Sequence, residues 1–165
     1  MKTRPTRSDS ELQGASGHLQ YEVWMFMELA GTLAAGRDIP LVTKNALLEA
    51  FTVHARVLLS VFYPANPRPD DVLAGDYFDD PATWERERPP LSPALQLVDR
   101  RAGKEVAHLT YARLTVSPEE KQWPFLEIAR DMAWVVIKFT ELAPLSRLGP
   151  QWREYVKVVG LKHGA

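Results

Sequence analysis

The sequence predicts an all-α protein, a single-domain helical bundle of about five to six helices. Apolar residues recur at intervals of three and four along several stretches, which is the spacing of a buried helical stripe. Prolines and Ser-Pro pairs stand between these stretches, at positions where helices begin and end. No stretch of useful length alternates apolar and polar residues as a half-buried strand does, and no segment repeats. This pattern favours helices packed on one another.

Two long helices are expected in the first half of the chain. Residues 18–35 carry one apolar stripe that Gly36 ends. Residues 1–16 are interpreted as a flexible tail, because no apolar run follows their basic residues. The second helix follows Pro40 and ends before Pro64. Its stripe is the most regular in the chain and consists of Leu47, Phe51, Ala55, Leu58 and Phe62.

An irregular connector is expected over residues 65–91, which are rich in proline and acidic residues and have no long period. We predict short turns at about 70–78 and 81–86, pinned to the core by Tyr77, Phe78 and Trp84. A connection of this length inside a compact domain is often functional.

The second half of the chain predicts further helices. Ser92-Pro93 supplies an N-cap and a first-turn proline for a helix that reaches about Leu114. Ser117-Pro118-Glu119-Glu120 is a capping box that starts the next helix, which Pro124 kinks or restarts. Helices over about 125–142 and 151–159 complete a domain that spans residues 17–162.

Composition and charge narrow the function classes. The net charge of −1 gives no global basic field, so nucleic-acid binding would need a local patch. The absence of cysteine excludes disulfides, thiol nucleophiles and cysteine-based zinc sites, and fits a reducing cytoplasm. The longest apolar run, residues 132–137, is far shorter than the roughly 20 residues that cross a bilayer. We therefore expect a cytoplasmic protein without membrane contact.

Arg101 and His108 are the leading candidates for chemistry. They lie seven residues apart in RRAGKEVAHLTYAR, and on a helix seven steps bring two side chains within roughly 20° of one face. A guanidinium can hold a phosphate and an imidazole can exchange a proton near neutral pH, so the pair suits phosphodiester chemistry. The helical stripe predicts that both lie off the centre of the core. Because about 10 Å of helix axis separates them, a two-fold dimer that supplies a second pair would favour this chemistry.

Basic residues around this pair give a local positive bias that the whole chain lacks. The candidate substrate-binding residues are Arg100, Lys104 and Arg113, with His54 added from the second helix. The alternative is structural: Glu105 pairs with Arg101 or His108 across one helical turn, and His54 is a satisfied residue at the edge of the core. If the second helix packs near the helix that carries Arg101 and His108, however, His54 borders the same cleft.

No metal and no cofactor are expected. The connector's acids, Asp70, Asp71, Asp76, Asp79 and Asp80, match no calcium-loop spacing and are typical of solvated turns. Trp123, Trp134 and Trp152 are interpreted as core or interface residues rather than as base-stacking platforms.

The chain resembles the HEPN superfamily. The resemblance covers about residues 41–143 and rests on an Arg, six residues and a His in RRAGKEVAH, with LLEAFTVHARVLLSVFY upstream. It implies a small helical domain, often a homodimer, many of whose members are metal-independent endoribonucleases of toxin–antitoxin and antiviral systems. Carried over by position, Arg101 stabilises charge on the phosphate and His108 transfers protons, while the RNA 2′-hydroxyl attacks.

The residue after the Arg is often polar in active HEPN members, and here it is Ala102. Three function classes therefore stay open. The first is a homodimeric RNA-cleaving or RNA-binding protein with a cognate antitoxin or other protein partner. The second is a non-catalytic helical protein-interaction module, and the third is a nucleotide-binding or nucleotidyl-transfer accessory domain.

Overall fold

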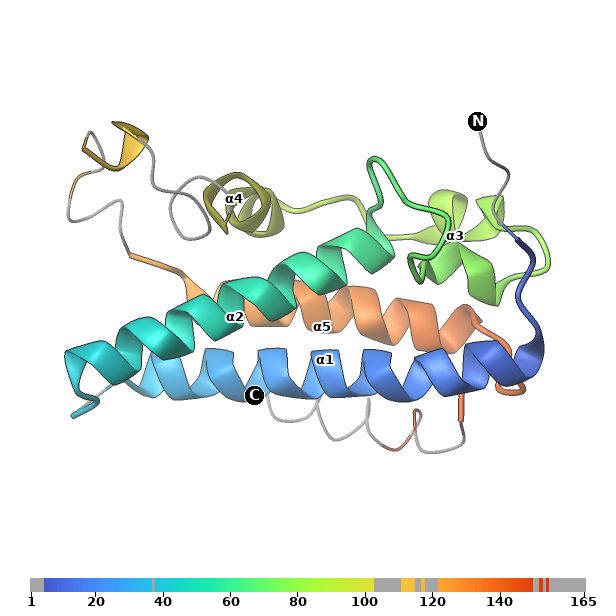
Figure 1. Ribbon diagram of the computed structural model, residues 1–165, viewed down its shortest axis with the longest axis horizontal. Coiled ribbons are helices and arrows are strands. Elements are labelled where there is room, and N and C mark those ends of the chain that lie inside the picture. Colours follow the sequence, from blue (N-terminus) through green and yellow to red (C-terminus); the bar gives the residue numbers. More distant parts are fainter. Residues whose placement is uncertain are drawn as a thin grey trace.

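The protein is all-helical in the computed structural model, as the sequence predicts (Figure 1). The structure describes residues 5–36, 38–102, 111–114, 117, 122–149, 152 and 154. This part of the chain contains five α-helices and no strand. The helices are α1 (Asp9–Ala35), α2 (Leu41–Phe62), α3 (Ala82–Glu87), α4 (Pro93–Arg101) and α5 (Phe125–Leu142). Two 3-10 turns, η1 (Ala74–Tyr77) and η3 (Tyr111–Leu114), accompany them.

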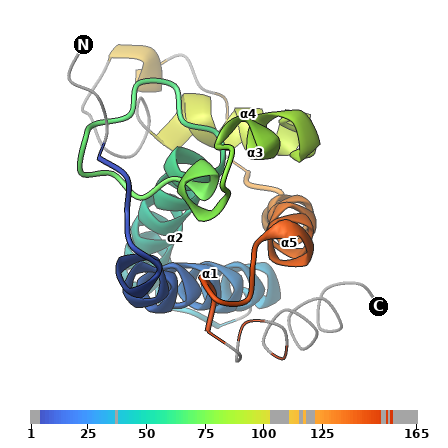
Figure 2. The same cartoon turned by 90° about the vertical axis from the view of Figure 1, so that its right-hand side faces the viewer.

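The three long helices, α1, α2 and α5, form the body of the bundle. α1 packs against both α2 and α5, and α2 runs antiparallel to it (Figure 1). The end-on view shows α1, α2 and α5 at three corners, with α3 and α4 beside the opening between α2 and α5 (Figure 2). α4 contacts both α2 and α5, so it closes this side of the core.

The first helix begins earlier than predicted. The prediction of a flexible tail over residues 1–16 is wrong from Asp9 onwards, because α1 begins there. The Ser8 Oγ accepts from the Glu11 backbone N–H, and the Glu11 carboxylate accepts from the Ser8 backbone N–H at 2.8 Å. This is a complete capping box, which satisfies two backbone donors at the helix start. Leu12 and Ser16 are buried in the core, so the domain includes residues before position 17.

The connector is part of the core, as its aromatic residues predict. Tyr77, Phe78 and Trp84 are buried, on or next to η1 and α3. The Trp84 indole N–H donates to the Phe62 carbonyl at 2.8 Å, which ties α3 to the end of α2. Phe139 of α5 is the common centre, because ring centroids of five aromatic residues lie 5.3–6.5 Å from its own. These residues are Phe62, Tyr77, Phe78, Trp84 and Trp152.

Arg147 joins three segments that are distant in the sequence. Its guanidinium donates to the Asp9 carboxylate at 2.9 Å, to the Tyr77 carbonyl at 3.1 Å and to the Asp79 carboxylate at 2.7 Å. The hydrogen bonds to the two carboxylates raise the pKa of Arg147. The start of α1, the connector and the turn after α5 are thereby held together.

The helix predicted from Ser92 to Leu114 differs from the structure at its C-terminal end. α4 ends at Arg101, and residues 103–110 lie outside the described residues. Tyr111–Leu114 is a 3-10 turn rather than the last turn of an α-helix. α5 begins directly after Pro124, so a helix starts at the proline where a kink or a restart is predicted. The starts predicted at Ser117 and Gln151 fall mostly outside the described residues.

α2 is long and apolar enough to cross a membrane, judged by length and composition alone. In the structure, α2 packs against α1 and α4, and Phe51, Leu58 and Phe62 are buried in the core. A core helix has this same composition. The absence of membrane contact stays a prediction.

Candidate functional site

Arg101 lies in the last turn of α4, a helix that its sequence starts sharply. The Ser92 Oγ accepts from the Leu95 backbone N–H at 3.2 Å, and Pro93 occupies the first turn. The Arg101 residue is only 7% exposed. Its Nη1 donates to the Gln122 carbonyl at 2.9 Å, and its guanidinium carbon lies 4.2 Å from the centroid of the Trp123 ring.

Arg101 therefore lies off the centre of the core, as the helical stripe predicts, but it is buried rather than exposed. Leu95, Val98 and Ala102 face the core, as predicted, and Arg101 stands on the edge of this face. The segment that precedes α5 passes over that edge, so Gln122 and Trp123 cover the guanidinium. Burial of Arg101 is tolerated because the methylene groups of its side chain are apolar, and because its guanidinium has the Gln122 carbonyl as acceptor and the Trp123 ring as a cation–π partner.

The other basic candidates separate into those the structure describes and those it does not. Arg100 is exposed, and a cation in the last turn of a helix interacts favourably with the helix dipole. Lys104 and His108 lie outside the described residues. The backbone of Arg113 belongs to η3, but its side chain also lies outside the described part. The convergence of Arg101 and His108 thus stays a prediction.

The end of the candidate segment exposes large apolar side chains. Tyr111 is 91% exposed and Leu114 is 82% exposed, and both belong to η3. They follow His108 by three and six residues. Exposed apolar residues that cluster on one short turn are typical of a surface that a partner covers.

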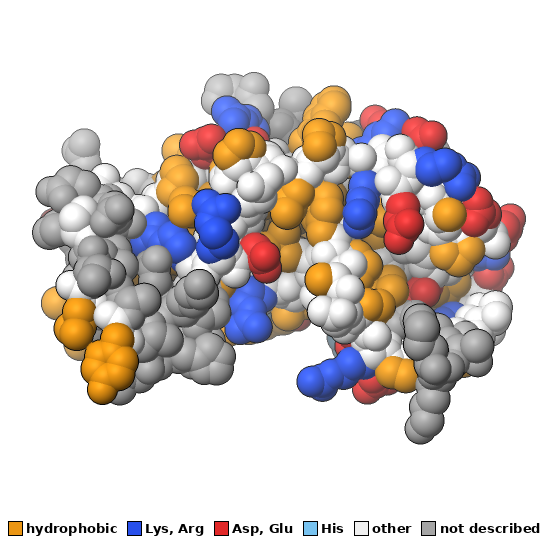
Figure 3. All heavy atoms as spheres, turned by 90° about the horizontal axis from the view of Figure 1, so that it is seen from above, with side chains coloured by type: hydrophobic (Ala, Val, Ile, Leu, Met, Phe, Trp, Pro, Cys, Tyr) orange, Lys and Arg blue, Asp and Glu red, His pale blue; other side chains and the backbone are white. Residues whose placement is uncertain are grey.

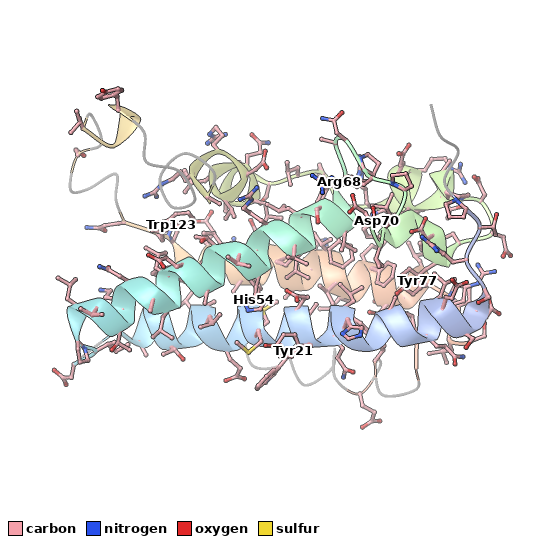
Figure 4. All side chains as sticks on the ribbon, viewed as in Figure 1. Tyr21, His54, Arg68, Asp70, Tyr77 and Trp123 are labelled. Carbon is pink, nitrogen blue, oxygen red and sulfur yellow. The ribbon has the colours of Figure 1, made fainter. Side chains whose placement is uncertain are left out.

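His54 forms a local pair with α1. Its Nδ1 lies 2.7 Å from the Glu22 Oε2, and the two side chains are 13% and 24% exposed. The Tyr21 ring meets the imidazole edge-on, with centroids 6.0 Å apart. α2 does pack near α4, but Figure 4 shows His54 between α2 and α1. This position confirms the interpretation of His54 as a satisfied residue at the edge of the core.

A hollow, which we call the α5 groove, lies between α5 and residues 89–95. Its volume is about 520 Å³. The lining residues are Pro89, Pro90, Ser92, Leu95, Arg130, Asp131, Ala133, Trp134, Val135 and Ile137. Figure 3 shows hydrophobic side chains exposed across the middle of the upper face of the molecule, between regions that carry charged side chains.

Sequence reasoning missed the α5 groove, although it singled out Trp134. Trp123 and Trp152 are buried, as predicted for core residues, but Trp134 is 62% exposed. Of the two predicted places for Trp134, core or interface, its exposure excludes the core of this chain, and a place in an interface stays a prediction. The signal was available: Trp134 lies four residues after exposed Arg130, on the polar side of α5.

Three of the connector's acids, Asp71, Asp76 and Asp80, are engaged locally. The Asp71 carboxylate accepts from the Arg68 backbone N–H, and the Asp76 carboxylate accepts from the Leu73 backbone N–H. The pKa of Asp80 is lowered, first by its hydrogen bond from the Ala82 backbone N–H and then by Arg86. Among the described residues, no group of three or more His, Asp and Glu side chains is arranged to hold a metal ion.

Comparison of the chain with family models, curated proteins and solved structures gives no significant match.

Proposed function

We propose that the protein is a HEPN-like homodimer that binds and cleaves RNA at the segment carrying Arg101 and His108. The all-helical fold is compatible with this proposal. The observation that carries it is the exposure of Tyr111 and Leu114 directly after the Arg-to-His segment. A second copy that covers these side chains would bring a second His108 close to the first.

The structure changes the role that we propose for Arg101. Because its guanidinium is held by the Gln122 carbonyl and the Trp123 ring, Arg101 is a positioning residue in the single chain. It fixes the end of α4, from which the His108 segment departs. Exposed Arg100 on the same turn is the better candidate for a phosphate contact.

The proposed reaction needs no metal and no protein nucleophile. One His108 accepts the proton of the RNA 2′-hydroxyl, whose oxygen then attacks the adjacent phosphorus. The bond from phosphorus to the 5′-oxygen breaks, and the second His108 of the dimer donates a proton to that leaving oxygen. The products are a 2′,3′-cyclic phosphate and a 5′-hydroxyl, so every proton and bond is accounted for.

The test is incubation of the full chain with mixed RNA in EDTA, with DNA of the same sequences as the control. We expect the wild-type protein to cleave RNA but not DNA, because DNA has no 2′-hydroxyl. His108→Ala should lower the rate by about 10²–10⁴-fold, the usual contribution of an acid–base group. Arg100→Ala should weaken RNA binding more than the rate at saturating RNA.

Equal cleavage by the wild-type protein and His108→Ala would refute the proposed site. Cleavage of DNA would refute attack by the 2′-hydroxyl. No cleavage by any of the proteins would favour the second candidate function below.

The second candidate is a non-catalytic helical module that binds a protein partner. The specific observation in its favour is that Arg101, the cation of the candidate pair, is already engaged within the chain. A residue whose charged head is satisfied internally stabilises the fold without contacting a substrate.

A further inference from the structure

The α5 groove is lined mostly by apolar side chains that leave one side open. Pro89, Pro90 and Leu95 form one wall, and Ala133 and Ile137 of α5 contribute to the other. Its volume of about 520 Å³ lies within the range of ligand-binding clefts, roughly 300–1,000 Å³. The hollow is therefore large enough to hold an apolar group from outside the chain.

Trp134 extends this apolar surface to the outside. Its neighbours Ala133 and Val135 are buried, whereas Trp134 between them is 62% exposed. A single exposed apolar residue is ordinary on a protein surface. Here the indole adjoins an apolar groove, so the two form one continuous surface.

The side chains at the groove that carry polar groups are those of Ser92, Arg130, Asp131 and Trp134. The Arg130 Nε and Nη2 both donate to the Asp131 Oδ1, at 3.2 and 3.1 Å, and the Arg130 side chain is 64% exposed. Within the described part of the chain, neither the Arg130 Nη1 nor the Trp134 indole nitrogen has a hydrogen-bond partner. Arg130 and Trp134 are four residues apart and share one face of α5. A ligand that complements them carries an anionic acceptor beside an apolar group.

We propose that the α5 groove binds a peptide segment of a protein partner that carries a large apolar side chain next to an aspartate or glutamate. The apolar side chain fills the groove beside Trp134. The carboxylate pairs with the Arg130 Nη1, which leaves the contact between Arg130 and Asp131 in place.

A peptide fits this surface better than a small aliphatic molecule does. Small-molecule sites bury about 70–90% of the ligand surface, but the open side of this groove would leave such a ligand in water. A peptide brings its own backbone and neighbouring side chains to cover Trp134. Tryptophan and arginine are also the residue types that contribute most at protein interfaces.

This proposal does not rest on RNA cleavage. Arg101 and Ala102, the described residues of the segment proposed for RNA cleavage, are not among the described residues that line the groove. Peptide binding and RNA cleavage can therefore each fail without the other.

The first experiment selects peptides from a phage-displayed library of random 12-residue sequences. The full-length wild-type protein, Arg130→Glu, Trp134→Ser and Trp24→Ser serve as targets. Trp24→Ser is the matched control, because Trp24 is also a half-exposed helical tryptophan but lies on α1. We expect the wild-type and Trp24→Ser pools to share peptides with an acidic residue close to a large apolar residue. Arg130→Glu should select Lys or Arg in place of the acid, and Trp134→Ser should lose the apolar preference.

The second experiment measures the fluorescence anisotropy of the best wild-type peptide, labelled with fluorescein. We expect Trp134→Ser and Arg130→Glu each to weaken binding by about tenfold or more, the effect of an interface hot spot. Trp24→Ser should bind within about twofold of the wild type. Urea denaturation of all four proteins shows whether a loss of binding is a loss of folding.

Four results would overturn the proposal. The first two are a selection that enriches no peptide and a wild-type pool without enrichment of acidic residues. The third is that Trp24→Ser weakens peptide binding as much as Trp134→Ser and Arg130→Glu do. The fourth is that laurate displaces the peptide and itself binds to the wild-type protein but not to Trp134→Ser. The last result would assign the groove to an aliphatic carboxylate instead of a peptide.

Discussion

Arg101→Ala is expected to destabilise the fold, because Arg101 connects α4 to the segment before α5. The substitution removes the hydrogen bond to the Gln122 carbonyl, and a hydrogen bond to a charged group contributes about 1.5–3 kcal/mol. It also removes the guanidinium from the Trp123 ring, a contact of about 2 kcal/mol when it is shielded from water. The two effects share one side chain and are not additive, so we expect a loss of about 2–4 kcal/mol in the free energy of unfolding.

Urea denaturation followed by circular dichroism measures this loss, with Arg100→Ala as the matched control. Arg100 is the exposed neighbour on the same turn, so its replacement should change stability by no more than about 0.5 kcal/mol. A loss of 2–4 kcal/mol lowers the melting temperature by roughly 4–16 °C for a chain of this size. Arg101→Lys should fall between the two variants, because an ammonium keeps the charge but not the planar guanidinium.

Equal unfolding midpoints for Arg101→Ala and Arg100→Ala, at equal denaturant slopes, would refute the anchoring role. If Arg101→Ala keeps its stability but abolishes RNA cleavage, Arg101 contacts the phosphate instead, and the positioning role that we assign to it is wrong.

Two further predictions concern α1. Gly14→Ala should raise the free energy of unfolding by about 0.5–1 kcal/mol, because a Cβ there meets nothing within 4 Å. Gly36→Ala should lower it, because φ is +37° and the Cβ would lie 2.9 Å from the Leu33 carbonyl oxygen. Thermal melts that rank both variants on the same side of the wild type would contradict this prediction. Hydrogen bonds from Ser8 lower the pKa of Glu11. Its carboxylate therefore stabilises the fold at pH values above the ordinary glutamate pKa of about 4.3, and this stabilisation is lost as the pH falls through the lowered pKa. Glu11→Ala should therefore melt below the wild type at pH 7 and approach it at acidic pH, and a constant difference across this range would show that the charge is not responsible.

Helix positions were predictable wherever the signal is local. The stripe of residues 41–62, the pair Ser92-Pro93 and the restart after Pro124 each appear in the structure where the sequence predicts them. The signal for the start of α1 was equally local, since Ser8 and Glu11 form a capping box. The basic residues before it obscured this signal. Tyr77, Phe78 and Trp84 were predictable as anchors because large aromatic side chains in a polar connector have no favourable place except a core.

The candidate site was less predictable, because its properties depend on residues distant in the sequence. A helical wheel places Arg101 at the edge of the apolar face of α4, but whether that edge meets water depends on the path of Gln122 and Trp123. Trp134 shows the converse case, since its residue type favours burial and yet no other element of the described chain covers its face of α5.

The sequence by itself determined the all-helical class, most helix boundaries and the aromatic anchors of the connector. These features follow from periodicity and capping, which act over a few residues. Only the tertiary structure decided that Trp123 covers the buried Arg101 and that His54 pairs with Glu22. It also decided that Trp134 borders an open apolar groove. Each of these outcomes depends on which surfaces the fold brings together, and helical periodicity does not contain that information.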